Sequence, residues 1–386
     1  MTRHALFAAG VLALAAAIIG HPAQAAPNPN DELFYQCDGF RPVDGSTDGV
    51  TFIRQNILFN RLLQPRVNVR PTKQGAAACT VALEDARLEP GYVMRRASLL
   101  RARAIHRLAA GQVAEALADL EAVRQLPIGD VDPNFHRSIM HGVDLATAYV
   151  LRLKGEHEAA EALALKAWRE RPYNRSTTYG ALLAIGADAS PDSLTPLLRR
   201  MAQLDPGVAE ALGSEAATGP ALDRPKLRRS LGDLNLFFDL LPDAEVKGRI
   251  PAFGPRVLGG DGYYQLKPPR LGVTRLVFEG WAASDDIVQE MALLRAAELA
   301  LKDGREGVFI MSRLDQQVVV STTVHGMVVR TDPGGYRSVL DVALNRSATS
   351  IEGAPEFGWR LLDARAVYRA LAPVYIPEKK RLPGYG

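Results

Sequence analysis

The pattern that most constrains this chain is a glycine–alanine–proline motif that occurs twice between residues 92 and 172. Each copy has a glycine, an alanine five residues later, a small or apolar residue further on, and a closing proline. These positions are Gly111, Ala116, Val123 and Pro127 in the first copy and Gly155, Ala160, Ala167 and Pro172 in the second. Each glycine separates two apolar patterns of helical period, and proline cannot continue a helix. The motif therefore predicts helical hairpins stacked side by side.

The apolar periodicity places the helices of these hairpins. We expect helices over 92–108 and 113–126 in the first copy, and over 139–153 and 158–169 in the second. A third, decayed copy runs over 177–206. The small alanines after each glycine sit where paired helices approach closely, so several copies together can build a continuous core.

These positions resemble the pattern of the tetratricopeptide repeat family, although the aromatic signature of that family's first helix is absent from both copies. The resemblance covers about 115 residues. It implies a concave groove lined by the first helix of each hairpin. Mapping the repeat positions onto this groove selects Arg101, Ile105, Tyr149 and Arg152.

Two guanidinium groups and an aromatic ring suit an extended peptide that carries an acidic side chain or a C-terminal carboxylate. An envelope protein or peptide is thus the expected partner of these four residues. The alternative is that they contact only the second domain or solvent. Two or three repeats form a short groove, so we expect modest affinity unless the C-terminal domain contributes.

Residues 1–25 have the features of a cleavable signal peptide. A basic start is followed by an apolar run over 5–19 and by the small-residue pattern Ala23-Gln24-Ala25. We expect cleavage after Ala25 and a periplasmic or secreted location; the alternative is a single membrane anchor. No later stretch approaches the roughly 18 to 20 apolar residues that span a bilayer. We therefore expect no transmembrane segment in the mature chain.

The segment 26–91 is expected to form an N-terminal extension with the first helices, over 51–63 and 76–84. It holds both cysteines of the chain, Cys37 and Cys79. An even cysteine count in an exported chain predicts a disulfide. The bridge would close a loop of about 40 residues and contribute roughly 3 to 4 kcal/mol. The alternative is two unrelated buried thiols.

The rest of the chain predicts a linker and a second domain. Residues 213–270 form a linker and an irregular segment, apart from an apolar stretch over 234–241 that we expect to pack against the repeats. The C-terminal domain, 271–386, is expected to be a small α/β domain with a mostly antiparallel sheet. We expect strands over 273–279, 307–311, 318–330 and 336–344, and helices over 285–302 and 364–371. A turn is expected over 332–335.

The stretch 293–301, Leu-Leu-Arg-Ala-Ala-Glu-Leu-Ala-Leu, is followed by Gly304 and an apolar strand. This arrangement is similar to that of an uncharacterised family of proteobacterial envelope lipoproteins, over about 100 residues. The chain lacks the lipidated cysteine of that family. The resemblance implies an envelope location and a similar small domain, and it implies no catalytic residue.

The sequence assigns no catalytic residue, metal ligand or cofactor. His136 and His141 are five residues apart, whereas ligand pairs on one helix face are three or four apart. A net charge of +3 does not favour a nucleic-acid partner. Glu298 is interpreted as part of a structural ion pair, with acid–base chemistry as the alternative.

The whole sequence thus predicts a multidomain protein with an all-α repeat domain and a small α/β domain. We expect a non-enzymatic interaction or assembly factor of the bacterial cell envelope. The alternative is a periplasmic enzyme, for example a cell-wall-related hydrolase, with its site at the domain junction.

Overall fold

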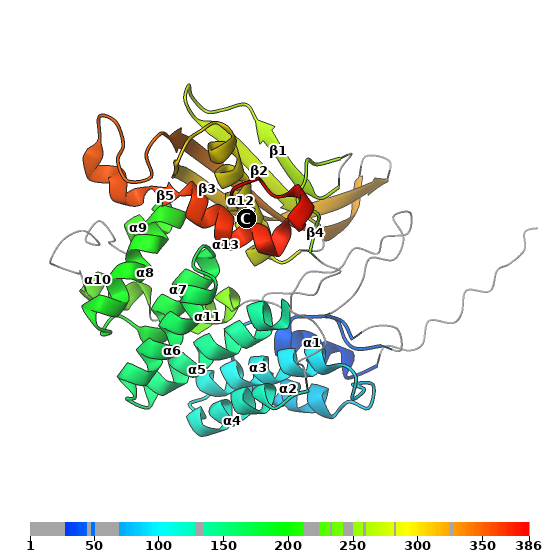
Figure 1. The fold of residues 1–386 in the computed structure, drawn as a ribbon. Helices are drawn as coiled ribbons and strands as arrows, with labels where there is room; N and C mark the ends of the chain where they lie inside the picture. Colours follow the sequence, from blue (N-terminus) through cyan, green and yellow to red (C-terminus); the bar gives the residue numbers. More distant parts are fainter. Residues whose placement is uncertain are drawn as a thin grey trace, which may run out of the picture.

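The computed structural model describes residues 28–44, 48–50, 69–127, 134–211, 224–231, 234–241, 250–257, 260–281, 283–324 and 327–385. A helical domain precedes a five-stranded antiparallel sheet that carries its own helices (Figure 1). The predicted combination of a helical domain with a small α/β domain is confirmed. The expected signal peptide and the helix expected over 51–63 lie outside the described residues.

The helical domain is built from successive helix pairs. Its described helices are α1 (Asp31–Asp38), α2 (Lys73–Glu84), α3 (Val93–Ala109), α4 (Val113–Arg124), a π-helical turn (His136–Met140), α5 (His141–Leu153), α6 (His157–Glu170), α7 (Arg175–Ile185), α8 (Pro191–Leu204), α9 (Pro206–Ala211), α10 (Arg224–Ser230) and α11 (Leu234–Leu240). The pairs α3–α4, α5–α6 and α7–α8 form hairpins, and the first helices α3, α5 and α7 are neighbours. The helical repeats expected from the sequence are therefore present.

The repeated motif acts at the turns and seams of these hairpins. Gly111 and Gly155 have φ angles of 74° and 82°, in the left-handed region that glycine adopts without strain. Ala116 and Ala160 are buried against the partner helix, as close approach requires. The structure thus agrees with the prediction that the glycines form the hairpin turns and the alanines lie between the paired helices.

The N-terminal segment is fastened to α3 by one covalent bond and a buried polar cluster. The predicted disulfide joins Cys37 of α1 to Cys79 of α2, with a Cα–Cα distance of 4.7 Å. Next to it, Asp38 accepts hydrogen bonds from the buried Arg95 at 2.9 Å and from Ser98 at 3.0 Å. Buried charges are tolerated when they are paired in this way. The disulfide fits a protein that folds outside the cytoplasm.

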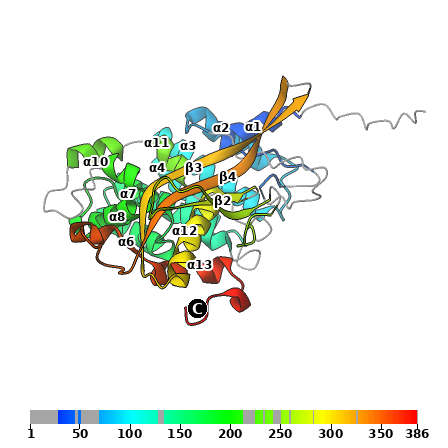
Figure 2. The same ribbon diagram turned by 90° about the horizontal axis from the view of Figure 1, so that it is seen from above.

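The sheet has the strand order β1-β2-β4-β3-β5. Its strands are β1 (Gly262–Leu266), β2 (Thr274–Gly280), β3 (Gly307–Val324), β4 (Met327–Asn345) and β5 (Leu362–Asp363). One face packs against α12 (Asp285–Lys302) and α13 (Ala364–Tyr375), with a core that includes Phe278, Ile310 and Leu340. Figure 2 shows β3 and β4 extending together past the other strands.

Two details of the sequence prediction for this domain were wrong. The segment 332–335 is not a turn, because it continues β4 and pairs with β3 at Val319↔Pro333 and Val320↔Asp332. The expected strand 307–311 and the first part of 318–330 belong to β3, whereas the last part of 318–330 and the expected strand 336–344 belong to β4. The two strands form one long hairpin, whose register shifts accommodate the proline and glycines. The segment before 270 was expected to be irregular, yet it contains β1, which pairs along the edge of β2.

None of the helices in the described ranges combines the length and apolar composition needed to cross a membrane. The apolar faces of the long helices in both domains instead pack in the two hydrophobic cores.

Substitution of Gly75 by alanine is expected to destabilise the N-terminal anchor. A Cβ at Gly75 would lie 2.2 Å from the His106 ring, and that ring is fixed by Thr72, which donates to Nδ1 at 2.9 Å, and by the Cys37 carbonyl, 2.7 Å from Nε2. Overpacking of a fixed core group costs about 1–3 kcal/mol. The measurement is urea denaturation of the oxidised protein. Gly91→Ala is the control, because a Cβ there meets nothing within 4 Å; equal midpoints for the two variants would contradict the prediction.

Candidate functional site

The candidate site is the surface formed by α3, α5 and α7, the first helices of the three hairpins, which we call the first-helix face. The predicted groove residues lie on α3 (Arg101 and Ile105) and on α5 (Tyr149 and Arg152). Arg101 and Ile105 are almost completely buried, with 5% and 0% of their surface exposed. In this structure these two side chains are therefore not open to a partner.

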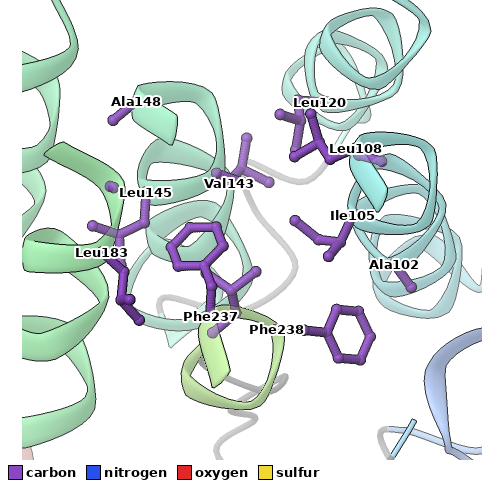
Figure 3. Close-up of a cluster of buried hydrophobic side chains, with 14 of the residues drawn as sticks. Ala102, Ile105, Leu108, Leu120, Val143, Leu145, Ala148, Leu183, Phe237 and Phe238 are labelled. Carbon is purple, nitrogen blue, oxygen red and sulfur yellow. The ribbon is translucent and has the colours of Figure 1, made fainter. Parts of the chain in front are cut away.

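The first-helix face is covered by α11, a seven-residue helix from the segment after the repeats. Phe237 stacks on Tyr149 of α5 with ring centroids 5.0 Å apart, and Phe238 lies 5.7 Å from the His106 ring of α3. Figure 3 shows Phe237 pointing toward α5 and α7, and Phe238 pointing toward Ile105 on α3. Both rings are buried, with 0% and 3% exposed surface. The chain thus occupies its own predicted binding surface.

The two arginines of the predicted groove have separate surroundings. The Arg101 guanidinium lies against the backbone of α5, since a Cβ at Gly142 would be 2.6 Å from its Nη1. Arg152 stacks over the Tyr149 ring at 4.7 Å. Its Nε donates to the Ala184 carbonyl near the end of α7 at 2.9 Å, which satisfies one of the carbonyls that a helix end leaves open. Arg101 thus packs between α3 and α5, while Arg152 joins α5 to α7.

The structure brings Ile105 and Tyr149 next to α11, whereas Arg152 contacts Tyr149 and α7. Binding of an external partner by the four residues stays a prediction. The sequence did predict that the apolar stretch 234–241 packs against the repeats. It gave no reason to place that stretch on the first-helix face. The sequence feature that could have indicated this position is the adjacent pair Phe237-Phe238, because two neighbouring aromatic rings on a short helix can insert between different helices.

A second cluster of functional groups lies between the helical and the sheet domains. Glu290 of α12 is completely buried and forms ion pairs with Arg171 at 2.9 Å and Arg137 at 2.7 Å. Tyr375 of α13 donates a further hydrogen bond to Glu290. Burial raises the pKa of Glu290, but the two guanidinium groups outweigh it and lower the pKa to about 2. The carboxylate is therefore ionised and holds both domains together.

Asp285, at the start of α12, lies in the same junction near Asp315 of β3. Burial, and then the negative charges of Asp315 and Asp286, raise the pKa of Asp285 to about 7, against the opposing effect of Arg175. Asp315 itself pairs with Arg313 at 2.7 Å, and Arg175 is 3.5 Å away. A perturbed carboxyl group of this kind is a candidate acid or base. Its neighbours, however, are arginines that bridge the two domains.

Two cavities lie away from both clusters. The larger, about 520 Å³, lies on the sheet face opposite α12, and a smaller one of about 360 Å³ lies between α1 and α2. Across the described segments, no group of three or more His, Cys, Asp or Glu residues could hold a metal ion.

We compared the chain with family models, with curated proteins and with solved structures, and none of them matched.

Replacement of Glu290 by glutamine is expected to destabilise the protein by about 3–5 kcal/mol at pH 7, because breaking a buried pair leaves an uncompensated charge. Urea denaturation followed by circular dichroism measures the change. Glu306→Gln is the control, since Glu306 is 53% exposed and 3.8 Å from Arg365. The contribution of Glu290 is present above its usual pKa of 4.5 and is lost as the pH falls toward 2. Loss of stability no greater than in the control would contradict this role.

Replacement of Asp285 by asparagine is expected to change the pH dependence of stability. The folded protein binds a proton at Asp285 below about pH 7, whereas the ordinary pKa is 3.8. Wild-type stability therefore declines between about pH 4 and pH 7, and Asp285→Asn removes this decline. The measurement is the denaturation midpoint of the variant minus that of wild type, and this difference should be more favourable to the variant at pH 8 than at pH 5. The same difference at both pH values would show that Asp285 does not carry the raised pKa.

Proposed function

We propose that this protein is a non-enzymatic interaction or assembly factor of the bacterial cell envelope. In this proposal its repeats are of the tetratricopeptide type, and α11 occupies their first-helix face until a partner segment replaces it. The single observation that supports this most is the burial of Phe237 and Phe238 between the helices that such repeats use for binding.

The length of α11 supports its description as an internal ligand. Isolated helices shorter than about 12–15 residues are marginal in water, and α11 has seven residues. Its helical form therefore depends on the surface that it covers. Insertion of apolar side chains from a short helix into a helical groove is a known mode of peptide recognition.

The partner is a segment with the chemistry of α11, namely two adjacent aromatic residues on a short helix. Because α11 is covalently attached, it competes with a high effective concentration. A partner must offer additional contacts to replace it. Tyr149 stacks on Phe237 of α11 and Arg152 lies over the Tyr149 ring, so a partner with an acidic side chain or C-terminal carboxylate has a guanidinium group nearby.

A periplasmic location is part of the proposal. It is supported by the disulfide, which is typical of oxidising compartments, and by the signal-peptide pattern of residues 1–25. The similarity of 278–312 to an envelope lipoprotein family points the same way. The partner is accordingly an envelope protein or peptide.

The alternative is a periplasmic enzyme with its site at the domain junction, and the raised pKa of Asp285 is the observation in its favour. It has less support, because Glu290 and Asp315 are paired with arginines. Such pairing accounts for their burial without catalysis. We therefore favour the interaction factor.

The test is whether α11 can be replaced in trans. A fluorescent peptide of residues 231–241 should bind Phe237→Ala/Phe238→Ala protein, because its first-helix face is vacated, and should bind wild type at least tenfold more weakly. Fluorescence anisotropy measures both. Phe357→Ala, which removes a ring that is 45% exposed in the sheet domain, is the control and should behave as wild type.

A peptide in which both phenylalanines are alanine should bind none of the proteins. Circular dichroism and the intact disulfide establish that the variant is folded, and Phe238→Ala alone replaces it if the double variant unfolds. A folded variant that does not bind the peptide would mean that α11 is a permanent part of the core, and the proposal would fail. Binding followed by capture of an envelope protein by the same variant would identify the natural occupant.

A further inference from the structure

The larger cavity, about 520 Å³, lies at one end of the sheet face that α12 and α13 leave uncovered. Phe309 and Met311 of β3 and Ala343 of β4 form its floor, and the segments 270–273 and 351–361 form its walls. Its volume is within the roughly 300–1,000 Å³ of small-molecule sites. The cavity is thus large enough for a ligand and is not part of either hydrophobic core.

Apolar side chains remain exposed around this cavity. Leu271 on one wall is fully exposed, and Phe357 on the other is 45% exposed. Isolated exposed apolar residues need no explanation, but apolar residues that converge on one concave site indicate ligand or partner binding. Covering them with an apolar group would be favourable by the hydrophobic effect.

Arg270 lines this cavity and Arg360 lies next to it, over the ring of the lining residue Phe309; both differ from other arginines of the same sheet face. Arg275 pairs with Asp341 and Arg337 pairs with Glu279, each through a close ion pair. Within the described part of the chain, no carboxylate lies within 4.0 Å of the arginine nitrogens at positions 270 and 360. Arg270 is therefore a charged lining residue that forms no ion pair within the described part of the chain.

The surroundings of these two cations leave them available to an anion. Among the described residues, Arg270 donates its side-chain hydrogen bond to the Met311 sulfur at 3.4 Å, and a thioether is a weak acceptor. Arg360 lies over the Phe309 ring at 4.9 Å, where burial lowers its pKa. A ligand carboxylate would give both guanidinium groups the charge-assisted partner that Arg275 and Arg337 already have.

We propose that this cavity binds a long-chain alkyl carboxylate, with the hydrocarbon chain against Phe309, Met311 and Phe357 and the carboxylate at Arg270 and Arg360. The site is separate from the first-helix face and does not depend on the function proposed for it.

The lining favours an alkyl chain over a peptide. Every peptide group that is buried needs a hydrogen-bond partner, whereas a hydrocarbon chain needs none. Besides Arg270, the polar side chain at the cavity is Asn345, and its amide nitrogen already donates to the carbonyls of Ser347 at 2.7 Å and Ser350 at 2.6 Å. An alkyl chain with one terminal anion therefore matches the cavity better.

The experiment is calorimetric titration of the oxidised full-length protein with dodecanoate below its micellar concentration. We expect saturable binding at one site and a rise in melting temperature. Dodecyltrimethylammonium has the same chain and the opposite charge, and it should bind at least tenfold more weakly. The double variant Arg270→Ala/Arg360→Ala should bind dodecanoate at least tenfold more weakly than wild type does, while its affinity for neutral 1-dodecanol should stay within about threefold of the wild-type affinity.

Leu271→Ser/Phe357→Ser should weaken both dodecanoate and 1-dodecanol, and these exposed positions tolerate substitution. Arg369→Ala, an exposed arginine on α13, is the charge control and should bind as wild type. Failure of wild type to bind dodecanoate, or equal binding by the double arginine variant, would overturn the proposal. Binding to phosphatidylglycerol vesicles without binding of monomeric dodecanoate would also overturn it, because the face would then be a membrane contact.

Discussion

The arrangement of the two domains depends on one buried carboxylate. Glu290 of α12 receives Arg171 and Arg137 from the helical domain and Tyr375 from its own domain. Sliding one domain along the other would break the ion pairs of Glu290 with Arg171 and Arg137 while the carboxylate stays buried, which costs several kcal/mol. The ion pairs therefore fix one orientation more strongly than they stabilise the fold. Apolar contacts alone would tolerate a range of orientations.

The hydrophobic core of the helical domain is completed by a segment that comes after the repeats. Phe237 and Phe238 belong to the same buried cluster as Ile105 and Leu183 (Figure 3). Repeat arrays normally leave their first helices open to a ligand, as an isolated array buries only its seams. Here the first-helix face is apolar enough to require a cover, and α11 supplies it. The same apolar character makes this face suited to a partner helix.

Local patterns made the hairpins and the disulfide predictable, because Gly111 and Gly155 need positive φ and the two cysteines lie in one short N-terminal segment. The long hairpin was missed because Pro333 with its neighbouring glycines has the composition of a turn, whereas register shifts admit these residues within β4. The groove residues Arg101 and Ile105 were placed on the expected helices. Arg101 is buried against α5, and Ile105 faces Phe238 of α11, which follows it by more than 120 residues in sequence, so no local pattern carries that information. The junction pair Arg171–Glu290 is equally non-local.

Helix α7 lies between the first-helix face and the domain junction, and its two ends make separate contacts with these two regions. Its C-terminal end contacts α11 and accepts the hydrogen bond of Arg152 at Ala184. At its N-terminal end Asn174 caps the helix by accepting from Thr177 at 2.7 Å and also donates to the Asp286 carbonyl of α12 at 3.4 Å. Loss of α11 removes contacts at one end of α7 only, while the cap and the Glu290 pairs still hold the other. The proposed exchange of α11 for a partner would therefore require no separation of the domains, and the free energy of the junction would not oppose it.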